Sequence, residues 1–183
     1  MASDSVNLRG FVRIKKNDDL VFEGNNHIVL TGRHWLLQRT FNIAYSPTND
    51  SQQNWLPLWF AIGSGGASND NPFQNIFPTD EDINVYHPIP FLETTNAVVA
   101  PYANSYYKKR ISSYSIDSYL SLKCVLDVGY EEAVDKHINE VGIFVAPTNL
   151  NTETSFVMLS HITFPTISKT NLDQLVFEWY YIF

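Results

Sequence analysis

The chain has 183 residues, of which 44% are apolar and 14% aromatic, enough for one domain with a hydrophobic core. Its net charge of −7 argues against a nucleic-acid-binding protein, which needs a basic face to hold phosphates. A single cysteine, Cys124, excludes an intrachain disulfide and a cysteine-based zinc site, and no apolar run is long enough to span a membrane.

The start of the chain predicts a β-hairpin. Residues 8–14 and 20–30 have the composition of strands, and the residues between them, Lys16-Asn17-Asp18-Asp19, are typical of a hairpin turn. Gly24-Asn25-Asn26 interrupts the second run and predicts a bend or bulge there.

A helix and a buried strand are expected next. Thr31 is a suitable N-cap for a helix over about residues 32–44. Residues 55–62 form a dense apolar run that is too short for an ordinary helix and predicts a buried strand. A long irregular loop then follows, over about residues 63–105, and loops of this length usually carry function or make interfaces.

The second half of the chain predicts further strands. Residues 111–128 indicate two strands or one long bent strand, and residues 138–146 indicate another. Two runs of strict alternation follow, which predict half-buried antiparallel strands with Phe156, Met158, Ser160, Ile162 and Phe164 on one face of the first, and Leu175, Phe177, Trp179, Tyr181 and Phe183 on one face of the second.

These elements predict a mainly β protein. We expect one domain over residues 1–183, an antiparallel β-sandwich or barrel-like fold of about eight strands with one short helix in the N-terminal half.

Residue patterns for catalysis are weak. Gly63-Ser64-Gly65-Gly66 follows a strand, but no lysine follows it, so a glycine-rich turn is favoured over a phosphate-binding loop. Ser160, His161 and Asp173 supply the residue types of a catalytic triad without a recognisable motif, and His161 is expected to lie at the surface or in an interface. We therefore expect no enzyme and no cofactor.

Charged and aromatic clusters have ordinary structural interpretations. The acidic groups at residues 80–82 and 131–135 could bind calcium, but solvated loops are favoured. Lys108-Lys109-Arg110 is expected to protect an exposed strand edge. Core packing is favoured for Trp55 and Trp59 over a platform for sugar binding.

Several segments, in this order, resemble small virion proteins of tailed bacteriophages. The similar segments are residues 26–38 (NHIVLTGRHWLLQ), 59–68 (WFAIGSGGAS), 138–145 (INEVGIFV) and 158–183, the last of which looks like the closing pair of strands in those proteins. Glu93 matches an acidic residue of the group, but Thr94-Thr95 follow it where a basic residue is common.

The resemblance implies a virion structural protein made in the cytoplasm of a bacterial host. It would be a tail, baseplate or neck component that forms a trimer or ring and connects neighbouring virion proteins such as tail fibres. A head decoration subunit and a carbohydrate- or receptor-binding module remain as alternatives. The interface is expected to involve the loop at 63–105 and six aromatic residues: Tyr106, Tyr107, Phe91, Trp179, Tyr181 and Phe183. No contact with nucleic acid or membrane is expected.

Overall fold

A computed structural model describes residues 8–41, 56–68, 71, 74–92, 107–118, 121–146 and 156–182. In these residues the fold is a curled antiparallel sheet with one helix. The elements are β1 (Arg9–Lys16), β2 (Asp19–Ile28), α1 (Leu30–Phe41), β3 (Leu56–Gly63), β4 (Pro88–Ile89), β5 (Lys109–Arg110), β6 (Ser113–Ser118), β7 (Ser121–Val128), β8 (Lys136–Ala146), β9 (Val157–Lys169) and β10 (Leu175–Ile182). The expectation of a mainly β, barrel-like fold with one short helix is confirmed.

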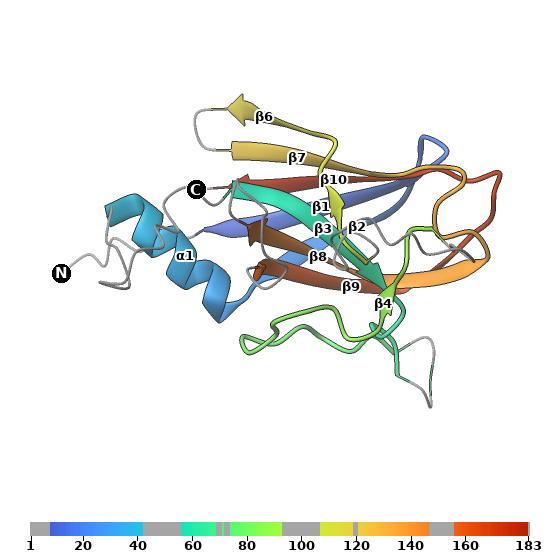
Figure 1. The fold of residues 1–183 in the computed structure, drawn as a ribbon, viewed down its shortest axis with the longest axis horizontal. Helices are drawn as coiled ribbons and strands as arrows, with labels where there is room; N and C mark the ends of the chain where they lie inside the picture. The colour runs from blue at the N-terminus through green and yellow to red at the C-terminus, as the bar shows by residue number, and fades with distance from the viewer. Residues whose placement is uncertain are drawn as a thin grey trace.

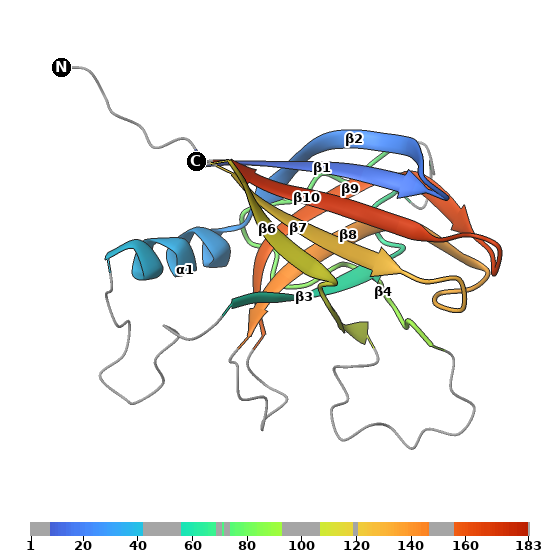
Figure 2. The same cartoon turned by 90° about the horizontal axis from the view of Figure 1, so that it is seen from above.

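The strands follow the order β4-β3-β8-β9-β2-β1-β10-β7-β6 across the sheet, and β5 pairs with β3. The sheet curls into a half-barrel, with α1 at one end (Figures 1 and 2). Strand β5 pairs with β3 through Lys109 and Arg110, and only Ile111 and Ser112 separate it from β6, which pairs with β7. The chain therefore passes from one end of the strand order to the other within a few residues.

Local chemistry explains the hairpin between β1 and β2. Asn17 and Asp18 have φ angles of 51° and 70°, the left-handed conformation that two-residue hairpin turns require and that Asn and Asp tolerate. The bulge of this hairpin lies at Val21, where the pairing skips from Phe22 to Leu20. Of the bend or bulge expected at residues 24–26, the bulge is wrong, because these residues pair in regular register with β1.

The helix begins earlier than its sequence signal indicates. Because α1 starts at Leu30, Thr31 lies inside the first turn and does not cap it. The Thr31 hydroxyl instead donates to the carbonyl oxygen of Met158 on β9, at 2.8 Å. Gly32 lies against the same strand, and a Cβ atom there would overlap the Leu159 carbonyl oxygen. The close approach of helix and strand backbone therefore depends on a glycine.

Burial separates two kinds of strand. In β10, buried and partly buried residues alternate, as the sequence predicts for a half-buried strand. In β8 every residue from Ile138 to Ala146 is buried, and in β9 every residue from Met158 to Phe164. The expectation that β9 is half-buried is wrong over this stretch, because its second face is covered by α1 and by the segment over residues 64–87, of which residues 64–68, 71 and 74–87 are described.

The helix α1 is too short to cross a membrane, and no other helix of the described residues is long and apolar enough to do so.

Candidate functional site

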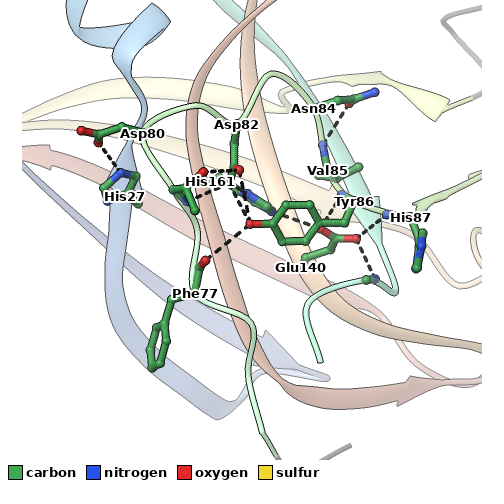
Figure 3. A network of polar contacts seen from close by, with 12 residues as sticks. His27, Phe77, Asp80, Asp82, Asn84, Val85, Tyr86, His87, Glu140 and His161 are labelled. Atoms are coloured by element: carbon green, nitrogen blue, oxygen red, sulfur yellow. Dashed lines mark hydrogen bonds and ion pairs between the residues drawn. The ribbon is translucent and has the colours of Figure 1, made fainter. Parts of the chain in front are cut away.

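A cluster of buried polar groups lies where β8 and β9 run side by side. Glu140 on β8 and His161 on β9 are placed on one face of the sheet, since His161 pairs directly with Gly142, two residues along from Glu140. The segment over residues 64–87 crosses this face and adds Asp82 and Tyr86 to the cluster (Figure 3). The side chains of Glu140 and His161 are 0% exposed and that of Asp82 is 7% exposed.

The Glu140 carboxylate holds this segment through its backbone. One oxygen, Oε1, accepts hydrogen bonds from the amides of Gly65 at 2.7 Å and His87 at 2.9 Å. The other, Oε2, accepts from the amide of Tyr86 at 2.8 Å and lies 3.1 Å from Nε2 of His161. One buried side chain thus fixes both ends of the segment over residues 64–87 to β8.

The Asp82 carboxylate holds the opposite side of the imidazole. Its Oδ2 atom lies 2.7 Å from Nδ1 of His161 and accepts from the Tyr86 hydroxyl at 3.0 Å. Thr79 donates its backbone amide and its hydroxyl to the same carboxylate, at 3.1 and 2.8 Å. Both ring nitrogens of His161 therefore lie within hydrogen-bond distance of a carboxylate oxygen, one of Asp82 and one of Glu140.

The two carboxyl groups are held in their ionised form. Burial alone raises the pKa of Glu140, but the hydrogen bonds from His161 and from the amides of His87, Tyr86 and Gly65 outweigh it, so its pKa lies below the ordinary value of 4.5. Burial also raises the pKa of Asp82, but hydrogen bonds from His161 and Thr79 bring it below the ordinary 3.8. For Tyr86, burial and the adjacent Asp82 carboxylate raise the phenol pKa, so it stays a donor.

The glycine-rich turn after β3 is the second part of this arrangement. The Gly65 amide binds Glu140 and the Gly66 amide donates to Oδ1 of Asn139 at 2.7 Å. A Cβ atom on Gly66 would overlap the Asn139 carbonyl oxygen, so glycine is needed for this approach. The turn does hold an anion, but the anion is the protein's own Glu140 carboxylate and not a phosphate.

The cluster combines acid and base groups of the kinds used in catalysis, but its contacts favour a structural role. His161 uses both nitrogens on carboxylates and has no exposed surface. Within the described part of the chain, no group of histidine, cysteine, aspartate and glutamate is arranged to hold a metal ion. The cluster stabilises the position of the segment over residues 64–87. A buried charged group holds its partners strongly when its charge is paired, as it is here.

The structure corrects three expected interface residues and leaves the others untested. Phe91, Trp179 and Tyr181 are 4%, 0% and 3% exposed, so their side chains fill the core and are not presented to a partner. Tyr107 is 40% exposed. Tyr106 and Phe183 lie outside the described residues, as do Glu93 and Trp55.

The residue types of a triad are not brought together. Ser160 lies 2.6 Å from the Tyr181 hydroxyl, on the face of β9 opposite His161. Asp173 accepts hydrogen bonds from Thr170 and pairs with Lys16, and these contacts lower its pKa to about 2.

Three other expectations are wrong at single residues: His161, Asp82 and Lys108. His161 is buried instead of at the surface, and Asp82 belongs to the buried cluster instead of a solvated loop. Lys108 is 8% exposed, with its amine 4.8 Å from the centre of the Phe144 ring, so it does not protect an exposed edge. The core placement expected for Trp59 is confirmed, at 8% exposed, and Cys124 is also buried, at 0% exposed.

The importance of Glu140 and its link to Asp82 were not recognised in the sequence. One signal was present: Glu140 is the single charge in a mostly apolar strand run from Ile138 to Ala146. A charge in the middle of a buried strand needs partners. The sequence does not indicate that these partners are His161, 21 positions away, and three backbone amides that lie 53 to 75 positions away in the chain.

Comparisons of the chain with protein-family models, with curated proteins and with solved structures give no match.

Proposed function

We propose that this protein is a structural subunit of a bacteriophage virion, a tail, baseplate or neck component that acts by contact and catalyses no reaction. The proposal rests on the order of the sequence segments that resemble such proteins and on one structural observation. The structural observation is that residues 76–83 form a surface segment with exposed apolar side chains, and that buried polar groups hold this segment in place.

The anchoring and the exposed side chains lie next to each other in the chain. Phe77 is 81% exposed and Ile83 is 74% exposed, although apolar side chains of this size are usually buried. Between them, Asp82 binds His161, and the Tyr86 hydroxyl lies 3.4 Å from the Phe77 carbonyl oxygen. Figure 3 shows the Phe77 ring directed away from the cluster. We call residues 76–83 the docking segment.

A docking segment that is already ordered before it binds a partner is suited to assembly. Ordering a loop on binding costs free energy, and a segment already fixed by Glu140, His161 and Asp82 avoids much of that cost. Exposed apolar groups next to polar ones are typical of protein-binding surfaces. A neighbouring virion protein would therefore bury Phe77 and Ile83, and the buried cluster would serve recognition by holding their backbone in place.

The test is incorporation into particles. A phage that lacks the gene is complemented with the wild-type chain, with a Phe77→Ser/Ile83→Ser variant, or with a Leu172→Ser control; Leu172 is 77% exposed in the turn between β9 and β10. Purified particles are then analysed by quantitative mass spectrometry. We expect the wild type and the control in a fixed copy number, and the double variant to be folded but missing.

Two results would contradict the proposal in different ways. A chain that is absent from purified particles would overturn the virion function itself. A double variant that is incorporated as well as the control would overturn the role of the docking segment.

A further inference from the structure

We propose that two copies of this chain pair through the free edges of their β6 strands and form a two-fold symmetric dimer. This surface is separate from the docking segment, and the proposal does not depend on a virion function. It rests on the edges of the sheet, on the side chains of β6 and on the registers that a two-fold axis allows.

The two ends of the strand order differ. At one end, short strands cover β3: β5 pairs with Trp59 and Phe60, and β4 pairs with Ile62 and Gly63. At the other end, β6 pairs with β7 and has no second partner among the described strands. A free edge offers unpaired backbone amides and carbonyls to another strand, and natural edges are usually protected by lysine, proline or a covering element. The residues from Ser113 to Ile116 include neither a charge nor a proline.

Strand β6 also carries apolar side chains on the face that is the core elsewhere. Tyr114 pairs with Cys124 and Ile116 pairs with Leu122, so each shares the face of its partner. Cys124 is 0% exposed, and Leu122 packs against the core cluster. Tyr114 and Ile116 are nevertheless 65% and 80% exposed. The apolar face of the sheet therefore continues onto β6, where the described part of the chain leaves it exposed.

A second copy is the occupant that fits this edge. A two-fold axis normal to the sheet leaves each side chain on its own face of the sheet. Residues that lie directly opposite each other must share a face, so the axis must lie at the level of one residue and not between two residues. An axis at Ser115 places Tyr114 of each copy opposite Ile116 of the other, which gives two aromatic–β-branched pairs. Ser115 then lies opposite itself, so the three central pairs of the register contain no charged residue.

The electrostatics around this axis also favour a second copy. The chain as a whole has a net charge of −7, but the strand next to β6 places Lys123 opposite Ser115. Lys123 is already paired with Glu178 on β10, at 2.9 Å. The free edge is thus locally balanced in charge, and the repulsion between two acidic chains is weak where they would meet. Because β4 and β5 cover the other edge, strand pairing between copies is expected to close as a dimer and not to extend as a filament.

The experiment measures mass in solution by light scattering coupled to size exclusion, over a series of protein concentrations. We expect the wild type to form a dimer whose fraction rises with concentration. Ile116→Lys should be monomeric at the same concentrations, because it places a charge in the pair with Tyr114. Leu172→Lys, an equally exposed site far along the chain, should remain dimeric. Circular dichroism of each variant checks that the sheet is intact.

A charge exchange at the axis makes the test specific for strand pairing and works even if Ile116→Lys fails to fold. Ser115→Lys and Ser115→Glu should each be monomeric alone, because like charges meet at the axis, and should form a mixed dimer when combined. A wild type that stays monomeric, or a dimer or larger species that persists in Ile116→Lys, would overturn the proposal. So would a mixture of the two Ser115 variants that does not associate.

Discussion

The two halves of the sheet have opposite relations to solvent. Strands β1, β10 and β7 bury one face and expose the other, where Arg13 on β1 lies between Glu23 and Glu178. Strands β8 and β9 are buried on both faces over most of their length, and their charged group, Glu140, lies inside. The half-exposed half tolerates charges as ordinary surface groups. The half that is buried on both faces can hold one only with a complete set of partners.

This difference decides what each charge contributes. Arg13 and Glu23 form a pair at 2.9 Å with side chains that are 46% and 45% exposed, and exposed pairs of this kind contribute about 0–1 kcal/mol. Glu140 is 0% exposed and is paired with His161 and three backbone amides. Removing one partner of such a buried set leaves unpaired polar groups, which costs much more than an exposed pair contributes.

The largest effect is expected for Glu140→Gln. The amide group has one acceptor oxygen in place of two, and its NH₂ group would face backbone amides that need an acceptor. We expect a loss of about 3–5 kcal/mol in the free energy of unfolding, measured by urea denaturation. Glu23→Gln on the exposed face is the matched control, with an expected change of about 1 kcal/mol or less. Equal losses for the two variants would show that the cluster is not a distinct source of stability.

A smaller loss is expected for Gly32→Ala. Alanine favours a helix over glycine by up to about 1 kcal/mol, but here its Cβ would overlap the Leu159 carbonyl oxygen, so α1 must move away from β9. We expect a net loss of about 1–3 kcal/mol, again from urea denaturation. Leu37→Ala, at a helix position that is 57% exposed, should change stability by less than Gly32→Ala. A stabilised Gly32→Ala variant would mean that the helix does not lie this close to β9.

The pH dependence of stability tests the ionised state of the cluster. The folded pKa values of Asp82 and Glu140 lie below their ordinary 3.8 and 4.5, so the unfolded chain binds protons first. Their contribution is therefore complete above the ordinary values and is lost as the pH falls through the folded ones. Asp82→Asn should reduce the slope of unfolding free energy against pH in this acid range. Asp80→Asn, at a carboxylate that is 50% exposed, should leave the slope closer to that of the wild type. Equal slopes in the wild type and in Asp82→Asn would contradict the account.

The smallest effect is expected on the exposed face. Arg13→Ala should lower the free energy of unfolding by less than any of the variants above, and high salt should reduce the difference from the wild type, because exposed pairs are screened. The measurement is urea denaturation at low and high salt. A loss as large as that of Glu140→Gln would remove the distinction between the two halves.

The sequence predicts the half-exposed strands better than the buried ones, for a physical reason. Apolar and polar residues alternate only where one face of a strand meets solvent. The alternation from Leu175 to Ile182 therefore predicts directly which residues are buried. The run from Met158 to Phe164 also alternates in part, but its second face is covered by segments far away in the chain, which no local pattern records. His161 is buried by these distant segments. Because the local sequence does not record them, it predicts a position at the surface or in an interface for His161.

The candidate site depends even more on distant contacts. The glycine-rich turn at residues 63–66 was recognised as a turn, but the anion it holds comes from Glu140, which is 75 residues away from Gly65. The bulge position in β2 and the first residue of α1 also differ from expectation. Pairing with β1 determines the position of the bulge, and packing on β9 determines where the helix begins. The residues of each element alone determine neither.

Hydrogen exchange at the amides of Gly65, Tyr86 and His87 shows whether the buried Glu140 carboxylate holds the segment over residues 64–87 on the sheet. In the wild type these amides should exchange slowly although they lie outside strands, because each donates to a buried carboxylate. In Glu140→Gln their protection should fall much more than that of the paired amides of β1 and β10. Rapid exchange at these three amides in the wild type, or an equal loss of protection over the whole sheet in the variant, would contradict the account.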